Sequence, residues 1–469
     1  MTRFGWRTGV VVVVVAVSVL VGMMVLARGS GEEPGPKGPS TPAMRQIDFA
    51  VWGGKEEVAA YQAVTDAYNE SSEDTSVTLS SWPDAAAMLD AMRDGDAKPD
   101  IYLLPRSELG ETITEGLNRP LLDLVTEREI PLGDDFSREA VAAFSVEDDL
   151  QCLPYTVSPM VIYYNTRLVD FEAMDARGLP TPKPDHSGWN LAEFRAAAEF
   201  ASRPRQGTRG VHIEPTLRGL APFIHSGGGQ VFNDEVDPTS LELGEDGSTD
   251  ALRQTLELLR DPRLTLSSKQ LAQRTAVEWF KRGRVAMIAG FRDLTPQLRK
   301  VTGLEFDVMP MPSLGSNRTV GELTGICLAP SGKPSRVDAA ANFLTYLVSD
   351  DAIGDLASTG YLQPAKLTVA LADDFLQPEQ APEHAGVFTD SVRDVVLPPL
   401  MQQSGALQAL INPEIEALLT TPVLDDLQES LRAIDEKSRS LLDPDYEAPS
   451  ESPSAASPTS SASPSDDRG

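Results

Sequence analysis

Residues 277–293 read VEWFKRGRVAMIAGFRD, and this stretch says most about the fold. Its first residues have a short helical pattern that ends at Gly283, because glycine readily adopts the left-handed conformation that closes many helices. The apolar run 285–288 then predicts a buried strand. We expect Gly290 to turn the chain after this strand, so that Phe291 and Arg292 protrude. A helix followed directly by a buried strand is typical of α/β proteins.

The region nearer the N-terminus shows a regular alternation of strands and helices. Strands are expected at 47–52, 77–79 and 100–104, and one of the helices between them presents Val58, Tyr61, Val64 and Tyr68 on a single face. A second helix is expected at 85–92. This order indicates βαβ crossovers and a parallel sheet.

The carboxyl ends of these three strands are candidate ligand positions, because ligands of open parallel sheets bind there. The ends read Trp52-Gly53-Gly54, Ser81-Trp82 and Leu104-Pro105-Arg106. Small residues let the backbone approach a ligand, and indole faces offer area for stacking. Turn glycines and ordinary core tryptophans are the alternative interpretation of the same residues.

Composition limits the function classes. The 469 residues suffice for two lobes and tails. The 40 basic and 70 acidic residues give a formal net charge of −30, which disfavours general binding to nucleic acid or anionic lipid. Two cysteines and four histidines leave little for metal chemistry. The histidines show no ligand spacing and are expected on the surface or in loops, so no metal or cofactor is predicted: His186, His212, His225 and His384.

Catalysis is not supported by any motif. The chain has neither a Gly-x-Ser-x-Gly elbow nor a His-Glu-x-x-His sequence. Tyr163 and Tyr164 cannot both point into one site, because successive strand residues face opposite ways. The adjacent acid pairs are interpreted as solvated faces or turns: 134–135, 148–149 and 373–374. A secreted hydrolase therefore remains a competing class without a catalytic constellation.

The two ends of the chain differ from the middle. Arg3 and Arg7 precede an uncharged run, 10–27, whose length as a helix, about 27 Å, is close to the thickness of a hydrocarbon core. Residues 1–28 are therefore expected to be an N-terminal membrane anchor or a cleaved signal peptide, with the rest of the chain outside the cell membrane. Residues 29–45 read as a flexible linker, and the Ser/Pro-rich residues 444–469 as a disordered tail.

Local signals also occur in the middle of the chain. Asn190 and Glu193 form a capping-box pattern that predicts a helix over 191–201. Trp189 precedes this cap, which favours a structural staple over a ligand contact. The glycines at 227–229 lack the Lys-Ser/Thr ending of a phosphate loop and are interpreted as a turn.

Several segments, taken in order, resemble the extracellular solute-binding proteins of ABC importers, in the group that carries oligosaccharides. The resemblance runs from about 47 to 442. It rests on the opening strand into Trp52-Gly53, Pro99-Asp100-Ile101, Leu153-Pro154-Tyr155 leading to Tyr164-Asn165, Phe280-x-x-Gly283-x-Val285-Ala286-Met287, Met309-Pro310-Met311-Pro312 and Gly360-Tyr361-x-x-Pro364-Ala365.

This resemblance implies an α/β protein with the two-lobed periplasmic-binding-protein type II fold, whose lobes are joined by hinge strands and hold ligand between them. The first lobe is expected to comprise 46–153 plus 326–362, and the second 154–325 plus 363–443. The implied ligand-binding residues are Trp52, Gly54, Trp82, Arg106, Tyr155, Arg218, Gly228, Phe291, Arg292, Glu322 and Tyr361. The resemblance also places Cys152 and Cys327 on neighbouring hinge strands and implies a disulfide, with two buried thiols as the alternative.

The expected function is therefore that of a binding protein. Aromatic faces stack on sugar C–H surfaces, and Arg or Glu side chains hydrogen-bond hydroxyl pairs, so an oligosaccharide or sugar derivative is expected. The arginines suit a carboxylate or phosphate equally well. The expected partners of the protein are this solute and the membrane permease of an ABC importer, and the protein is expected to be a monomer. A membrane-tethered receptor or scaffold without transport is the alternative.

Overall fold

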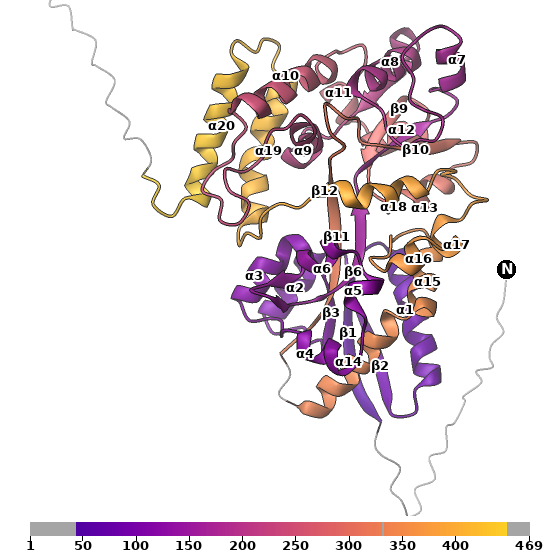
Figure 1. Ribbon diagram of the computed structural model, residues 1–469, viewed down its shortest axis with the longest axis vertical. Helices are drawn as coiled ribbons and strands as arrows, with labels where there is room; N and C mark the ends of the chain where they lie inside the picture. The colour runs from indigo at the N-terminus through magenta and orange to yellow at the C-terminus, as the bar shows by residue number, and fades with distance from the viewer. Residues whose placement is uncertain (1–43, 331–332, 448–469) are drawn as a thin grey trace, which may run out of the picture. The chain divides into compact units, whose positions relative to one another are not determined.

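A computed structural model describes residues 44–330 and 333–447. The predicted N-terminal anchor or signal, nearly all of the linker and most of the Ser/Pro-rich tail lie outside these residues. Within the two described ranges, no helix is both long enough and apolar enough to cross a bilayer. The molecule is an α/β protein with two lobes, each built on its own sheet (Figure 1).

The first lobe is built on a six-stranded sheet in the order β12-β11-β3-β1-β2, in which β6 also pairs with β11. β1 is parallel to both β2 and β3, as the strand–helix alternation predicted, whereas β11 is antiparallel to β3 and β6. The strands are β1 (Arg45–Trp52), β2 (Thr75–Trp82), β3 (Ile101–Pro105), β6 (Leu153–Pro159), β11 (Thr319–Leu328) and β12 (Val395–Val396).

Helices cover both faces of this sheet because each has one apolar stripe to bury. In α1, the predicted Tyr61, Val64 and Tyr68 are buried, whereas Val58 is only partly so. The helices of this lobe are α1 (Lys55–Ser71), α2 (Ala85–Arg93), α3 (Leu109–Thr114), α4 (Leu122–Glu127), α5 (Leu132–Asp135), α6 (Arg138–Ala143), α14 (Pro334–Leu347) and α15 (Asp350–Ser358). A small hairpin joins β4 (Ser145–Val146) to β5 (Asp149–Leu150), and α16 (Leu367–Ala370) and α17 (Asp373–Leu376) pack with α15.

The second lobe is built on a four-stranded sheet in the order β10-β7-β9-β8. Its strands are β7 (Val161–Asn165), β8 (Arg209–His212), β9 (Val285–Gly290) and β10 (Phe306–Pro310). Strand alternation is visible in β7, where Tyr163 packs near Phe306 and Tyr164 near Phe171, in two separate core clusters. The prediction that these two tyrosines cannot share a site is therefore confirmed.

The helices of the second lobe include α8, whose sequence signals are all present in the structure. The capping box of Asn190 and Glu193 is formed, and Trp189 packs against Phe194 with ring centroids 5.1 Å apart, the arrangement of a hydrophobic staple. The helices are α7 (Phe171–Asp175), α8 (Leu191–Ala201), α9 (Leu217–Ser226), α10 (Asp246–Leu259), α11 (Ser268–Leu271), α12 (Ala276–Lys281), α13 (Leu294–Arg299) and α18 (Gly386–Ser391).

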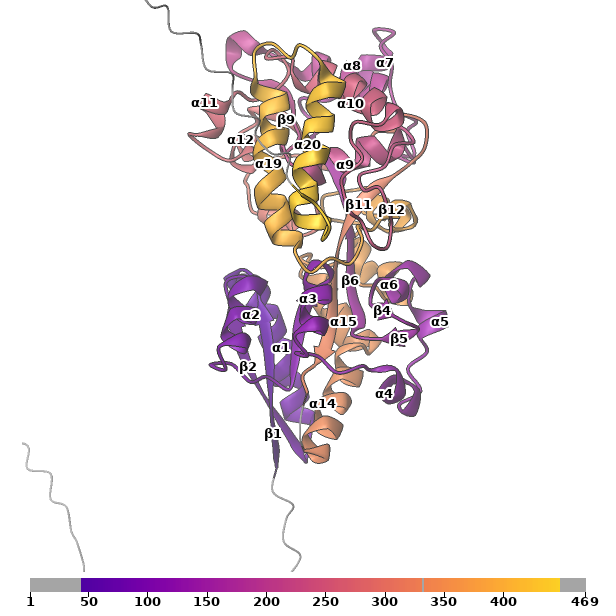
Figure 2. The ribbon, with the colours of Figure 1, turned by 90° about the vertical axis from the view of Figure 1, so that its left-hand side faces the viewer.

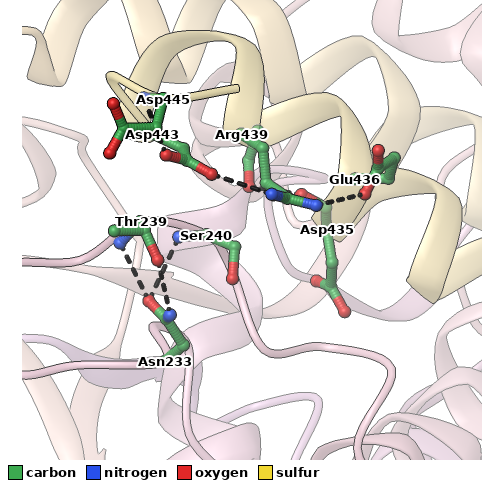
Figure 3. A network of polar contacts seen from close by, with 9 residues as sticks. Asn233, Thr239, Ser240, Asp435, Glu436, Arg439, Asp443 and Asp445 are labelled. Carbon is green, nitrogen blue, oxygen red and sulfur yellow. Dashed lines mark hydrogen bonds and ion pairs between the residues drawn. The ribbon is translucent and has the colours of Figure 1, made fainter. Parts of the chain in front are cut away.

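Two C-terminal helices, α19 (Ser404–Thr420) and α20 (Leu427–Leu442), lie side by side against the second lobe (Figure 2). Their buried residues, such as Ile411 and Ile434, belong to the core cluster of that lobe. Polar contacts fasten the neighbouring loop. Asn233 accepts hydrogen bonds from the backbone of Thr239 and Ser240, and near it Arg439 pairs with Glu436 and Asp443 at the end of α20 (Figure 3).

The lobes are connected through β6 and β11, which lie side by side where the two lobes meet (Figure 1). The chain passes from β6 through Met160 directly into β7 of the second sheet. The predicted disulfide between Cys152 and Cys327 is present, and both residues are completely buried. It ties the start of β6 to β11 on the first-lobe side of this connection.

Candidate functional site

Trp52 and Trp82 lie next to each other at the ends of two parallel strands. They are paired in the register of β1 and β2, and both side chains are partly buried. The Trp52 indole Nε1 donates to the Leu103 carbonyl at 3.0 Å, and the Gly53 amide donates to the Trp82 carbonyl at 3.1 Å. These bonds hold the loop ends in place, so the indoles are presented from a rigid edge of the sheet.

The turn after β1 depends on its two glycines. Gly53 has a φ of 135°, and a Cβ at this position would overlap the carboxylate of Glu57. Gly54 is the extended N-cap residue of α1, and its backbone N–H acts to lower the pKa of that same carboxyl group. Glu57 therefore folds back over the start of its own helix, close to Trp52. Glu57 was not among the residues expected from the sequence.

Arg218, Phe291 and Glu322, three of the residues implied by the resemblance, come together in the structure. The Arg218 guanidinium lies over the Phe291 ring, 4.2 Å from its centroid, and forms an ion pair with Glu322. Arg218 begins the exposed side of α9, Phe291 follows β9, and Glu322 is on β11. An exposed arginine fixed by an aromatic face and a carboxylate can offer remaining N–H groups to a polar ligand.

Two acidic groups near this cluster have raised pKa values. Loss of solvent, followed by the charge of Asp293, raises the pKa of Glu57 to about 7. Loss of solvent, followed by the charge of Glu322, raises the pKa of Asp293 to about 6. Asp293 retains an exposed surface, so the surrounding protein removes only part of its solvent. The charge of Asp293 acts on Glu57, and the charge of Glu322 acts on both, so these three carboxyl groups lie near one another.

We expect acid to favour this arrangement of the lobes. Because both pKa values are raised, Glu57 and Asp293 stabilise the arrangement fully below their ordinary pKa values, and this contribution is lost as pH rises through about 6 and about 7. Small-angle scattering between about pH 5 and about pH 8 should show a larger radius of gyration at the higher pH.

The matched control is the double variant Glu57→Gln and Asp293→Asn. It keeps the size and hydrogen-bonding capacity of both side chains and removes their titration, so its radius of gyration should depend less on pH. An identical pH response in this variant and in the unaltered protein would contradict the assignment.

A second contact between the lobes surrounds Tyr361. Glu56 at the start of α1 forms an ion pair with Lys300, which follows α13, and accepts a hydrogen bond from the Tyr361 hydroxyl at 2.5 Å. Lys300 and Glu56, like Glu57, were not among the residues expected from the sequence. Tyr361 thus donates a hydrogen bond to an ion pair that connects the first and second lobes.

Arg106 and Gly228, two of the expected ligand-binding residues, form hydrogen bonds within the protein. Arg106 donates to the carbonyl of Ala143 at 3.0 Å and to that of Pro398 at 2.7 Å, and loss of solvent lowers its pKa to about 10. Gly228 is exposed, with a φ of 83°, in the turn after α9, as the interpretation of 227–229 as a turn predicted. Its amide donates to the His225 carbonyl.

Arg292 and Tyr155 are fully buried in this structure. Contrary to the expectation that Arg292 protrudes after Gly290, its guanidinium lies between the rings of Phe375 and Phe388 and donates to the Phe375 carbonyl at 3.0 Å. Tyr155 packs in the core cluster that also contains Tyr163 and Phe306. In this conformation neither side chain is accessible to a ligand.

Two of the four histidines differ from the expectation of surface or loop positions, because His212 ends β8 and His225 lies within α9, whereas His186 and His384 lie in the segments before α8 and α18. His186 and His212 are 8% and 6% exposed, respectively, and His186 stacks on His384. His186 and His384 line a cavity of about 290 Å³ in the second lobe, and another cavity, of about 570 Å³, lies along α8. Neither cavity includes any of the eleven expected ligand-binding residues.

Comparison with known proteins identifies the family. Residues 63–383, more than half of the chain, match the family model of bacterial extracellular solute-binding proteins. No curated protein sequence matches the chain.

Solved structures share the fold at low sequence identity. An ABC substrate-binding protein from Listeria monocytogenes in complex with cycloalternan is 17% identical, with a TM-score of 0.72 over 85% of this chain and 98% of that one. The GacH receptor of Streptomyces glaucescens is 18% identical, with a TM-score of 0.68 over 86% and 100%. The maltose-bound MalE3 of T. maritima is 16% identical, with a TM-score of 0.67 over 85% and 100%.

These comparisons confirm the two-lobed fold expected from the sequence. The family consists of binding proteins that act outside the cytoplasm, in agreement with the prediction that the chain is not an enzyme. With its two sheets joined through β6 and β11, this chain belongs to the bacterial extracellular solute-binding protein family.

Proposed function

We propose that this protein is the extracytoplasmic substrate-binding component of an ABC importer and captures an oligosaccharide or sugar derivative between its lobes. The observation that carries the proposal is the pairing of Trp52 and Trp82 at the ends of β1 and β2. The ion pair of Arg218 and Glu322 supplies polar groups for the same site. Glu57 links the two, since it folds over the Gly53 turn and senses the charges of Asp293 and Glu322.

The chemistry of this region suits a polyol. Indole faces stack on the C–H surfaces of sugar rings, and the Arg218–Glu322 pair offers both donors and acceptors for vicinal hydroxyls. The ligands named for the structural neighbours, cycloalternan, acarbose and maltose, are also carbohydrates or carbohydrate-like. The remaining expected ligand-binding residues, including Gly54 and Tyr361, are part of this proposal.

Binding and delivery would follow from lobe closure. Ligand contacts that form only when both lobes are engaged shift the open–closed equilibrium, because a ligand can move that equilibrium only by its differential affinity. We place the hinge in β6 and β11 and propose the lobe limits 46–153 plus 326–362 and 154–325 plus 363–443. Three elements of the last segment nevertheless contact the first lobe, since α16 and α17 pack with α15 and β12 pairs with β11. The closed monomer would then present both lobes together to the permease, with residues 1–28 as its anchor or signal.

A ligand screen tests this proposal. Calorimetry and thermal shift with mono- and oligosaccharides should give saturable binding, and scattering should show compaction on addition of the ligand. Organic acids and phosphosugars form the counter-set, since the arginines suit anions as well. Binding only in the counter-set would overturn the carbohydrate assignment. Sugar uptake in cells that lack the gene then separates transport from a receptor role.

Replacing Trp52 or Trp82 by alanine should weaken binding of the solute found in the screen about tenfold or more, or about 1.4 kcal/mol, because each change removes a stacking face. Trp279 is the matched control: it is also partly buried, and its Nε1 also donates to a backbone carbonyl, that of Gln270 at 3.1 Å. Trp279→Ala should leave affinity unchanged. Equal affinity in all three variants would show that the site lies elsewhere.

A further inference from the structure

Three potential metal ligands from distant parts of the chain meet in the second lobe. His186 lies in the loop before α8, Asp307 on β10, and His384 just before α18. One ligand atom from each residue lies within 4.8 Å of the other two. His186 and Asp307 are buried, and His384 is partly exposed. The site is separate from the tryptophan-bearing strand ends of the first lobe.

The carboxylate of Asp307 directs one oxygen at both imidazoles. Its Oδ1 accepts hydrogen bonds from the backbone amides of Val308 at 2.9 Å and His384 at 3.0 Å, which fix its orientation. Its Oδ2 lies 2.5 Å from Nδ1 of His384 and 3.8 Å from Nε2 of His186. Oδ2 is therefore the point on which the two ring nitrogens converge.

The surroundings of His186 are those of a metal-binding imidazole. Its Nδ1 lies 3.1 Å from the carbonyl oxygen of Pro184, which can only accept, so Nδ1 carries the proton. Nε2 is then unprotonated, and its lone pair accepts a hydrogen bond from the Tyr164 hydroxyl at 2.8 Å. Metal-bound histidines commonly donate their other ring N–H to a backbone carbonyl, because this fixes the tautomer and the ring orientation.

The cavity beside these rings has mostly acidic walls. Its volume is about 290 Å³, and its ionisable lining beyond the two histidines comprises Asp185, Glu383, Asp390, Arg393 and Asp394. The two imidazoles stack with centroids 3.6 Å apart and an angle of 12°, so two protonated rings would repel each other face to face. An acidic cavity next to two close imidazoles favours a cation bound by nitrogen and oxygen.

We infer that His186, Asp307 and His384 form a binding site for one divalent transition-metal ion of the Zn²⁺ type. Imidazole nitrogens with a carboxylate oxygen are the donors that Zn²⁺ and its neighbours prefer, whereas Mg²⁺ and Ca²⁺ prefer oxygen alone. On binding, one imidazole turns out of the stack, because the lone pairs of two nearly parallel rings do not point at one ion. Tyr164 then gives up its bond to Nε2 of His186, His384 carries its proton on Nε2, and Glu383 or water completes the coordination. The ion links the α7–α8 loop, β10 and the segment leading to α18, and thereby stabilises the second lobe.

Metal titration of the full chain, without a histidine tag and after treatment with a chelator, tests this inference. Calorimetry with Zn²⁺ should show one site, Zn²⁺ should raise the unfolding midpoint, and Co²⁺ should give visible absorption bands. His186→Gln and His384→Gln should each weaken Zn²⁺ binding by about 10–100-fold or more, since loss even of groups that only orient ligands has that effect. Circular dichroism verifies that each variant is folded.

The other two histidines of the chain provide the matched control. His212→Gln and His225→Gln should retain the Zn²⁺ affinity and the Co²⁺ spectrum of the unaltered protein. The inference is overturned if the unaltered protein binds none of the metals, if both His186→Gln and His384→Gln bind normally, or if a control variant loses the site. If one ligand variant does not fold, the other decides. Solute binding is measured separately, so its presence or absence does not affect this result.

Discussion

Loss of the Cys152–Cys327 disulfide should lower the free energy of unfolding by about 3–5 kcal/mol. The two cysteines are 175 residues apart in the sequence, so the crosslink closes a large loop and restricts the unfolded chain strongly. The variant Cys152→Ala with Cys327→Ala, unfolded in guanidinium chloride, measures this difference. Both residues are fully buried, so a reductant reaches the bond readily only after unfolding.

The single variants distinguish the crosslink from packing. Either Cys152→Ala or Cys327→Ala already removes the bond, so each should lose nearly as much stability as the double variant. Unaltered protein refolded with a reductant should show a similar loss without any change of sequence. Losses that add between the two single variants would assign the effect to buried contacts instead. Two free thiols after denaturation and alkylation of unreduced protein would refute the bond itself.

Arg292→Ala should lower the free energy of unfolding by about 2–4 kcal/mol, as truncation of a large core side chain does. The side chain is completely buried, and its guanidinium lies against the rings of Phe375 on α17 and Phe388 on α18. Chemical denaturation measures the change. The sequence-based expectation of a ligand contact predicts the opposite pattern, a loss of affinity with little change in stability.

Two further variants make this comparison decisive. Within the described residues, Nε and Nη1 of Arg292 have no hydrogen-bond partner, so Arg292→Met keeps the stem, removes a buried charge and should be more stable than Arg292→Ala. Arg218→Ala is the exposed counterpart: its ion pair with Glu322 is solvent-accessible, so stability should change by less than about 0.5 kcal/mol while solute affinity falls. A stable Arg292→Ala with weakened solute binding would restore Arg292 to the ligand site.

These contrasts show which site features were readable in the sequence. Trp52 and Trp82 could be placed at one sheet edge because parallel strands align their carboxyl ends, and the register of β1 and β2 confirms this. Glu57 and Asp293 were missed, since a lone acidic residue in a chain with 70 of them carries no signal. Only the close approach of Glu57 to the Gly53 turn distinguishes it.

The residues of the inferred metal site illustrate the same limit. His186 and His384 are separated by nearly two hundred positions, so their spacing resembles no ligand motif. They meet because the loop before α8 and the segment before α18 both pack beside β10, where Asp307 holds the His384 backbone. Long-range packing of this kind leaves no periodic trace along the chain.

What the sequence determined alone was local: the capping box and staple of α8, the helix end at Gly283 with a φ of 63°, and the alternating faces of β7. Each depends on residues within a few positions, whose backbone preferences act regardless of the rest of the fold. Tertiary structure decided the directions of the two neighbouring side chains that follow β9. Phe291 meets Arg218, whereas the next residue turns into the core, because α17 and α18 supply two aromatic faces and a carbonyl for its guanidinium.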